Sequence, residues 1–339
     1  MDLWNYYTSG KRSRHRRHSA NHITRRRNPI LREMDNHVTK MSNPHIKHKM
    51  NCSPAVLSKK VSHSCYTPHI LLQIRNAYNE GHSAEEQIKT TDPTEIWKIL
   101  NQRLVHCQKE DCWLHQIKDA ALRKRIDRYI FAPDRPPEWS KNPNAWLSNF
   151  DILNVLEQYE QAPEYKHFEF IGPTPIDFDD PLPNEGQRQC VYNELCHFHL
   201  NTLVRKGKTK IGIVFNLDKH NQSGSHWVSL FVDVENRFLF YFDSAGSRCP
   251  KRIMELVKRI KQQALELGKH YRFYQNYPKT HQYSNTECGV YSLFFIITML
   301  TSRTKYKSGL SIQEKLELFK KHRIPDKYIE RYRHEYFNG

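Results

Sequence analysis

Cys288 is the residue whose surroundings most suggest chemistry. It is followed by Gly289 and by an almost uniformly apolar run over 290–300, so it is expected to open a buried helix. At a helix N-terminus, the dipole and the free backbone N–H groups stabilise a thiolate. The sequence therefore predicts a cysteine nucleophile at residue 288.

A histidine and a carboxylate lie in two segments that are typical of an antiparallel hairpin. His226 and Trp227 begin the first strand, Asp243 ends the second, and the polar residues 235–236 lie between them. Pairing across that turn places Asp243 opposite Val228, on the same face as His226. The carboxylate would then hold the imidazole tautomer and favour its charged form.

A side-chain amide stands in the same segment as the thiol. Gln282 precedes Cys288, and its N–H and the backbone N–H of Cys288 are candidate donors to a developing oxyanion. Gly289 would let the backbone approach a substrate closely. Taken singly, each residue has a plainer explanation in core packing or turn formation. The prediction of a catalytic site depends on their combination.

The elements that would position these residues belong to a region of mixed strands and helices, residues 131–339. Before it, residues 61–130 are predicted to be mostly helical, with a helix beginning near Pro68 and apolar repeats continuing to residue 122. A proline-rich break over 132–137 is interpreted as a linker.

The positive charge is concentrated at the start of the chain. Of a formal net charge of +17, residues 1–60 contribute fourteen Lys and Arg against three Asp and Glu, and they show no apolar periodicity. This composition predicts a disordered basic arm. Its charge favours binding to DNA or RNA through phosphate neutralisation, or a nuclear-import signal. The plainer alternative is a solvated tail.

Composition bounds the class of protein. The chain has 339 residues, of which 38% are hydrophobic and 26% charged, as in ordinary soluble domains. Its longest apolar run is too short to span a bilayer, and the N-terminus lacks a signal-peptide core. We therefore expect a cytosolic or nuclear protein whose eight scattered cysteines are reduced thiols.

One group of Cys and His residues invites a zinc interpretation. It consists of His106, Cys107, Cys112 and His115, with Cys65 as a further candidate. The cysteine spacing is wider than a CxxC knuckle, and no second Cys pair follows. Cysteines buried in a helical core are the favoured interpretation. Neither a metal nor another cofactor is expected.

The order of the candidate residues resembles the clan of ubiquitin-like-protein (SUMO) proteases, which includes the adenovirus maturation protease. That clan has His-Trp on a strand, a following Asp, and a Gln shortly before Cys-Gly. The residues His226-Trp227, Asp243 and Gln282 with Cys288-Gly289 match this pattern.

A second motif extends the resemblance over residues 138–302. The segment Trp146-Leu147-Ser148-Asn149, followed by Ile152, is similar to the Trp-Leu-Asn-Asp…Ile motif that opens the clan's catalytic core. It departs from the motif in having Ser-Asn in place of Asn-Asp. The resemblance implies that Trp146 and Trp227 form the walls of a narrow tunnel for a Gly-Gly segment.

The fold that the resemblance implies is α+β. It would be a papain-like cysteine protease core, with a mixed or antiparallel sheet and a central helix that bears the nucleophile. An N-terminal helical region would precede this core. More loosely, residues 61–130 resemble the helical N-terminal region of proteases that large DNA viruses encode.

Three functions are compatible with these features. The first is a cysteine endopeptidase that cleaves after Gly-Gly-X-like sites in viral structural precursors during virion maturation, located in the virion and host cytoplasm or in the nucleus. The second is an isopeptidase that removes SUMO-like or ubiquitin-like modifiers. The third is a nucleic-acid-binding packaging protein with a protease fold.

Overall fold

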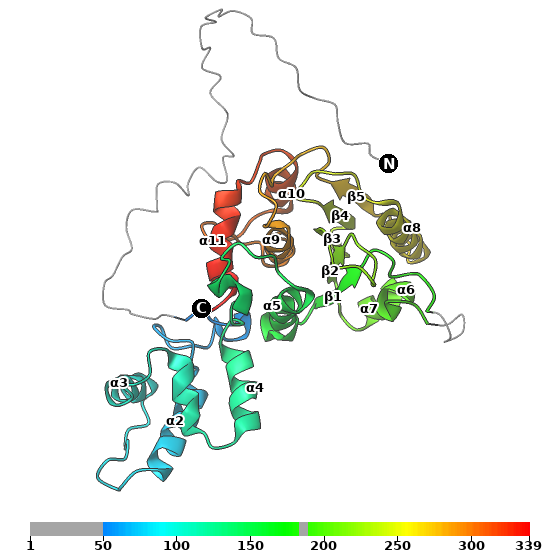
Figure 1. The fold of residues 1–339 in the computed structure, drawn as a ribbon. Coiled ribbons are helices and arrows are strands. Elements are labelled where there is room, and N and C mark those ends of the chain that lie inside the picture. Colours follow the sequence, from blue (N-terminus) through cyan, green and yellow to red (C-terminus); the bar gives the residue numbers. More distant parts are fainter. Residues whose placement is uncertain (1–49, 183–188) are drawn as a thin grey trace, which may run out of the picture.

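The structure, a computed structural model, describes residues 50–182 and 189–339 (Figure 1). Most of the predicted basic arm, residues 1–49, lies outside the described residues. Residues 50–60 are folded, so the predicted disorder is wrong for them. The Asn51 amide donates to Asn338 Oδ1, and the Ser53 amide donates to the Ile130 carbonyl. These hydrogen bonds tie the segment to the neighbouring helical region and to the C-terminus.

The helical region that follows residue 60 has an apolar core of its own, centred on Leu71, Ile96 and Trp113. Prolines open two of its helices, where their missing N–H costs nothing. Its cysteine-containing stretch forms a short 3-10 helix rather than a continuous α-helix. The elements are η1 (Pro54–Val56), α2 (Pro68–Glu80), α3 (Pro93–Arg103), η2 (Glu110–Gln116) and α4 (Ala120–Ile130).

A five-stranded mixed sheet forms the centre of the remaining chain, with its strands in sequence order. The outer pairs, β1 with β2 and β4 with β5, are parallel, whereas β3 is antiparallel to both of its neighbours. The strands are β1 (Phe168–Pro175), β2 (Lys210–Asn216), β3 (Trp227–Asp233), β4 (Phe238–Phe242) and β5 (Arg272–Gln275). Ser229 pairs with Phe242, which confirms the predicted hairpin register.

Helices cover both faces of the sheet (Figure 1). The first face packs against α5 (Asn149–Gln161), α9 (Cys288–Thr301), α10 (Ile312–Lys320) and α11 (Asp326–Tyr336). The opposite face packs against α7 (Leu200–Arg205) and α8 (Lys251–Glu266), with the short α6 (Asn193–Cys196) beside them. Two further 3-10 helices of the described residues are η3 (Pro137–Ser140) and η4 (Pro163–Tyr165). The predicted α+β fold with a central helix bearing Cys288 is confirmed.

The C-terminal residues hold the proline-rich segment that was predicted as a linker. The Asn338 amide donates to the Pro133 carbonyl, and the Arg135 amide donates to the Asn338 carbonyl. The Asn338 side chain also donates to the Ala132 carbonyl. The segment over 132–137 is therefore a fixed connection between the helical region and the core.

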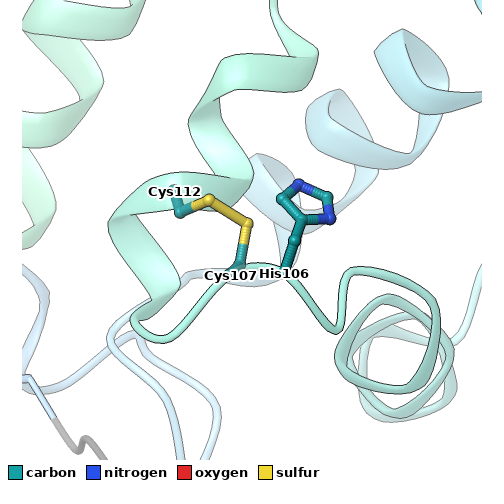
Figure 2. Close-up of side chains that lie close together, drawn as sticks. All are labelled: His106, Cys107 and Cys112. Atoms are coloured by element: carbon teal, nitrogen blue, oxygen red, sulfur yellow. A yellow bond between two sulfur atoms is a disulfide. The ribbon is translucent and has the colours of Figure 1, made fainter.

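Six cysteines are joined in disulfides, so the expectation of reduced thiols is wrong for them. The pairs are Cys52–Cys65, Cys107–Cys112 and Cys190–Cys196. Figure 2 shows the second pair beside His106. Folding of the chain brings the paired Cα atoms within 5.2 to 6.2 Å, which is bonding range. Cys107 and Cys112 are half-buried disulfide partners and not core thiols.

Within residues 50–182 and 189–339, none of the helices is both long and apolar enough to cross a lipid bilayer.

Candidate active site

Cys288 is the first residue of α9 and is 1% exposed. Every residue of this helix from Cys288 to Leu300 is buried, because an apolar run with no polar face must be surrounded by protein. The helix packs against the sheet between α5 and α11. This burial fixes the thiol at the helix N-terminus, as predicted from the sequence.

His226 and Asp243 meet at the end of the β3–β4 hairpin. His226 lies directly before β3 and Asp243 directly after β4, and His226 Nε2 is 2.6 Å from Asp243 Oδ1. The carboxylate also accepts hydrogen bonds from the backbone amides of Ala245 and Ser247. Asp243 is therefore held on three sides, and its position fixes the imidazole ring.

His226 interacts with Cys288 as well, so it lies between the carboxylate and the thiol. Burial by itself would lower the histidine pKa. The interactions with Asp243 and Cys288 outweigh this effect and raise the pKa of His226 to about 10. At neutral pH the imidazole is therefore charged.

This shift predicts the alkaline limit of the reaction. In the cysteine-protease reaction expected from the sequence, charged His226 would give its proton to the leaving amine. The value of kcat/KM should therefore stay high above pH 6.5 and fall as the pH rises through about 10. The same shift adds stability that is complete below about pH 6.5 and is lost as the pH rises toward 10. A pH profile of peptide hydrolysis measures the limit.

The control for this profile is Asp243→Asn. It removes the larger of the two hydrogen-bonded partners that raise the histidine pKa, so the alkaline limb should move toward pH 6.5. A wild-type limb at the ordinary histidine pKa would contradict the charged imidazole.

Gln282 is positioned on the loop that leads into α9. Its Oε1 accepts a hydrogen bond from Ser244 Oγ at 2.6 Å, and its Nε2 donates to the Ser284 carbonyl at 2.9 Å. An amide nitrogen carries two hydrogens, so one N–H of Gln282 is not engaged by these two bonds. That N–H is the candidate oxyanion donor that the sequence predicted.

A buried ion pair supports the residue before the nucleophile. Arg333 of α11 donates to Glu287 through Nε and Nη2, at 2.9 Å each, and both side chains are almost fully buried. Arg333 also donates to the carbonyls of Ala145 and Thr286, and its guanidinium stacks on Trp139. One side chain thus links the last helix, the start of α9 and the segment that leads to Trp146.

A cleft of about 720 Å³ lies beside Trp227, the residue that follows His226 in the sequence. Trp146 and Trp227 both line it, and they differ in exposure: Trp146 is 42% exposed and Trp227 only 6%. The indole N–H of Trp227 donates to the Leu147 carbonyl and fixes the ring. The lining of the cleft also includes Pro173 and Thr174 at the end of β1, Asn216 at the end of β2, and Gly224 in the loop after β2.

Gly289 is packed tightly at the start of α9. It is buried, and an added Cβ would lie 3.1 Å from Leu147 Cβ and 3.3 Å from Trp227 Cδ1. A larger residue would press on Leu147 and Trp227. The glycine therefore allows this close packing, and the predicted contact of its backbone with a substrate stays a prediction.

Two residues of this site were missed by sequence reasoning. Arg333 lies outside the segment that carried the resemblance, and nothing in its local pattern marks it. Ser244 directly follows Asp243, and adjacency to the carboxylate was the one signal that could have identified it.

The family comparisons agree with this geometry. Residues 206–336 match the model of the Ulp1 protease family, C-terminal catalytic domain. A protein of Acanthamoeba polyphaga mimivirus that is named as a thiol protease is 32% identical over 284 residues, which cover 78% of this chain and 89% of the relative.

Two comparisons involve African swine fever virus. A protein of its Kenya isolate, named SUMO-1 cysteine protease, is 29% identical over 239 residues, which cover 66% of this chain and 85% of the relative. The crystal structure of a protease from the same virus superposes with a TM-score of 0.58 at 21% identity, covering 85% of this chain and 95% of that structure. The superposition supports the fold.

Proposed function

The chain belongs to the Ulp1 family of cysteine proteases, together with thiol proteases of large viruses, and we propose that it is an endopeptidase that acts on viral structural precursors. It would cleave these precursors after Gly-containing sites, such as Gly-Gly-X, during virion maturation. The observation that carries the proposal is the position of His226 between Asp243 and Cys288. His226 directly precedes Trp227, which lines a cleft together with Trp146.

The proposed reaction follows from these positions. The Cys288 thiolate attacks the scissile carbonyl carbon, and the developing oxyanion accepts hydrogen bonds from the Cys288 amide and from Gln282. Protonated His226 gives its proton to the leaving amine. Water then hydrolyses the thioester, with neutral His226 as the base, and the thiolate and the imidazolium are restored.

The preference for glycine is supported by the walls of the cleft. Trp227 is fixed by its bond to Leu147, and Leu147 packs against Gly289, so this wall has little room to move. A glycine adds no side chain to the space between this wall and Trp146, and the resemblance to the SUMO proteases implies a Gly-Gly segment there. We therefore expect small residues on the amino side of the cleaved bond.

Removal of a SUMO-like modifier is the second candidate, because one viral relative is named SUMO-1 cysteine protease. The chemistry is the same, and only the recognised protein differs. Purified enzyme should be compared on viral precursor proteins with Gly-Gly-X sites, and on SUMO and ubiquitin carrying a C-terminal electrophile. Precursor cleavage without probe labelling of Cys288 supports maturation, and rapid labelling by one modifier with intact precursors supports deconjugation.

The basic segment suggests a role in placing the enzyme. We propose that it holds the protease on DNA or RNA in the virion and the host cytoplasm, or in the nucleus, where precursors are cleaved. Residues 50–60 fold with the rest of the chain, so the deletion that tests this must stop at residue 49. Salt-sensitive DNA binding should vanish in that variant while peptidase activity is kept. Nucleic-acid binding with no peptidase activity in the full chain would instead support a packaging protein.

A further inference from the structure

We propose that Ser244 is a positioning residue for catalysis, which sets the orientation of the Gln282 amide and thereby completes the oxyanion site. This inference rests on the assignment of Gln282 as an oxyanion donor. Two consecutive residues would then orient two groups of the site: Asp243 orients His226, and Ser244 orients Gln282.

Ser244 contacts Gln282 through both its backbone and its side chain. The Ser244 carbonyl accepts hydrogen bonds from the amides of His281 and Gln282, both at 2.9 Å. Its hydroxyl donates to Gln282 Oε1 at 2.6 Å, and the serine is 1% exposed. If this hydroxyl were removed, water could not easily reach Gln282 Oε1 to take its place.

The orientation of the amide decides whether the glutamine can work. The two ends of a glutamine amide have nearly the same shape, but only the nitrogen end can donate to an oxyanion. The Ser284 carbonyl can only accept, so it must face Nε2, and the Ser244 hydroxyl must then donate to Oε1. With both partners present, the free N–H of Nε2 is the remaining donor.

The loop around Gln282 is fixed from its other side as well. The amides of Tyr283 and Ser284 donate to the Asp326 carboxylate at the start of α11. His281 is buried, with Nε2 donating to the Phe319 carbonyl and Nδ1 accepting from the Ile324 amide. The backbone therefore keeps its place without the Ser244 hydroxyl. Loss of that hydroxyl should act on the amide orientation and not on the fold.

The experiment is a double-mutant cycle of Ser244→Ala and Gln282→Ala, with kcat and KM measured on a Gly-Gly-X peptide. Gln282→Ala should lower kcat about 10²-fold to 10³-fold, as removal of an oxyanion donor does elsewhere. Ser244→Ala should lower kcat about 10-fold with KM unchanged, because the buried Oε1 loses its donor and the amide keeps only one of the two hydrogen bonds that hold it in place. When Gln282 is already alanine, Ser244→Ala should lower kcat hardly any further.

Two measurements separate positioning from a general structural effect. The rate of Cys288 alkylation as a function of pH should be unchanged in Ser244→Ala, because His226 and Asp243 are untouched. Ser244→Thr keeps the hydroxyl and should recover most of the lost kcat. An equal loss from Ser244→Ala in both backgrounds, or no loss at all, overturns the role of Ser244. An unchanged kcat in Gln282→Ala would instead overturn the oxyanion assignment itself.

Discussion

Replacing Cys288 with alanine is expected to abolish peptide-bond cleavage while leaving the protein folded. The thiolate forms the covalent intermediate, and no other group at the site can replace it, so kcat should fall by about 10⁵-fold or more. The side chain loses one sulfur atom at the start of a helix whose burial comes from its other residues. Hydrolysis of a Gly-Gly-X peptide and circular dichroism measure the two effects.

Cys249→Ala is the matched control for this substitution. Among the described residues, Cys249 and Cys288 are the cysteines outside disulfides. Burial raises the pKa of the Cys249 thiol to about 12, so it remains protonated at neutral pH and is a poor nucleophile. Its alanine variant should keep full activity. Equal activity in Cys288→Ala and wild type would show that another group carries the reaction.

Replacing Arg333 with methionine is expected to destabilise the protein strongly. It would leave the Glu287 carboxylate buried without its partner, next to the nucleophile, and would remove the donor to the Ala145 and Thr286 carbonyls. Breaking one side of a buried ion pair costs about 3–5 kcal/mol. In denaturant unfolding, the variant should reach its midpoint at a lower denaturant concentration than the wild type.

Two variants show whether the effect comes from the buried charge. Arg333→Met combined with Glu287→Gln removes both charges and should recover part of the lost stability. Arg331→Met, on the same helix, removes a partly exposed cation that donates to Tyr306 and should cost less than about 1 kcal/mol. If Arg333→Met and Arg331→Met destabilise equally, the ion pair is not what secures the start of α9.

The catalytic core could be predicted because local patterns fix it. The uniformly apolar run after Cys288 permits only a buried helix, and the short turn between β3 and β4 leaves one natural register. That register alone brings Asp243 to the side of the sheet where His226 stands. Both predictions needed only the period of the side chains and the length of one turn.

Other features depend on contacts between distant parts of the chain. Arg333 is one of many basic residues, and its burial follows from the way α11 packs over the start of α9. The pairing of six cysteines cannot be deduced from their positions, since six allow several connectivities. The packing of Gly289 against Leu147 is likewise a contact between distant parts of the chain, and no local pattern marks it.

The most direct test of the proposed activity is to map the new N-termini that the enzyme creates in a library of protein-derived peptides. Wild-type protein and Cys288→Ala should be incubated in parallel, and the cleaved products sequenced by mass spectrometry. We expect cleavage after paired or Gly-rich small residues in the wild-type sample and none of it with Cys288→Ala. Cleavage after bulky residues would contradict the proposed preference for small residues, and equal cleavage by both proteins would contradict the assignment of Cys288 as the nucleophile.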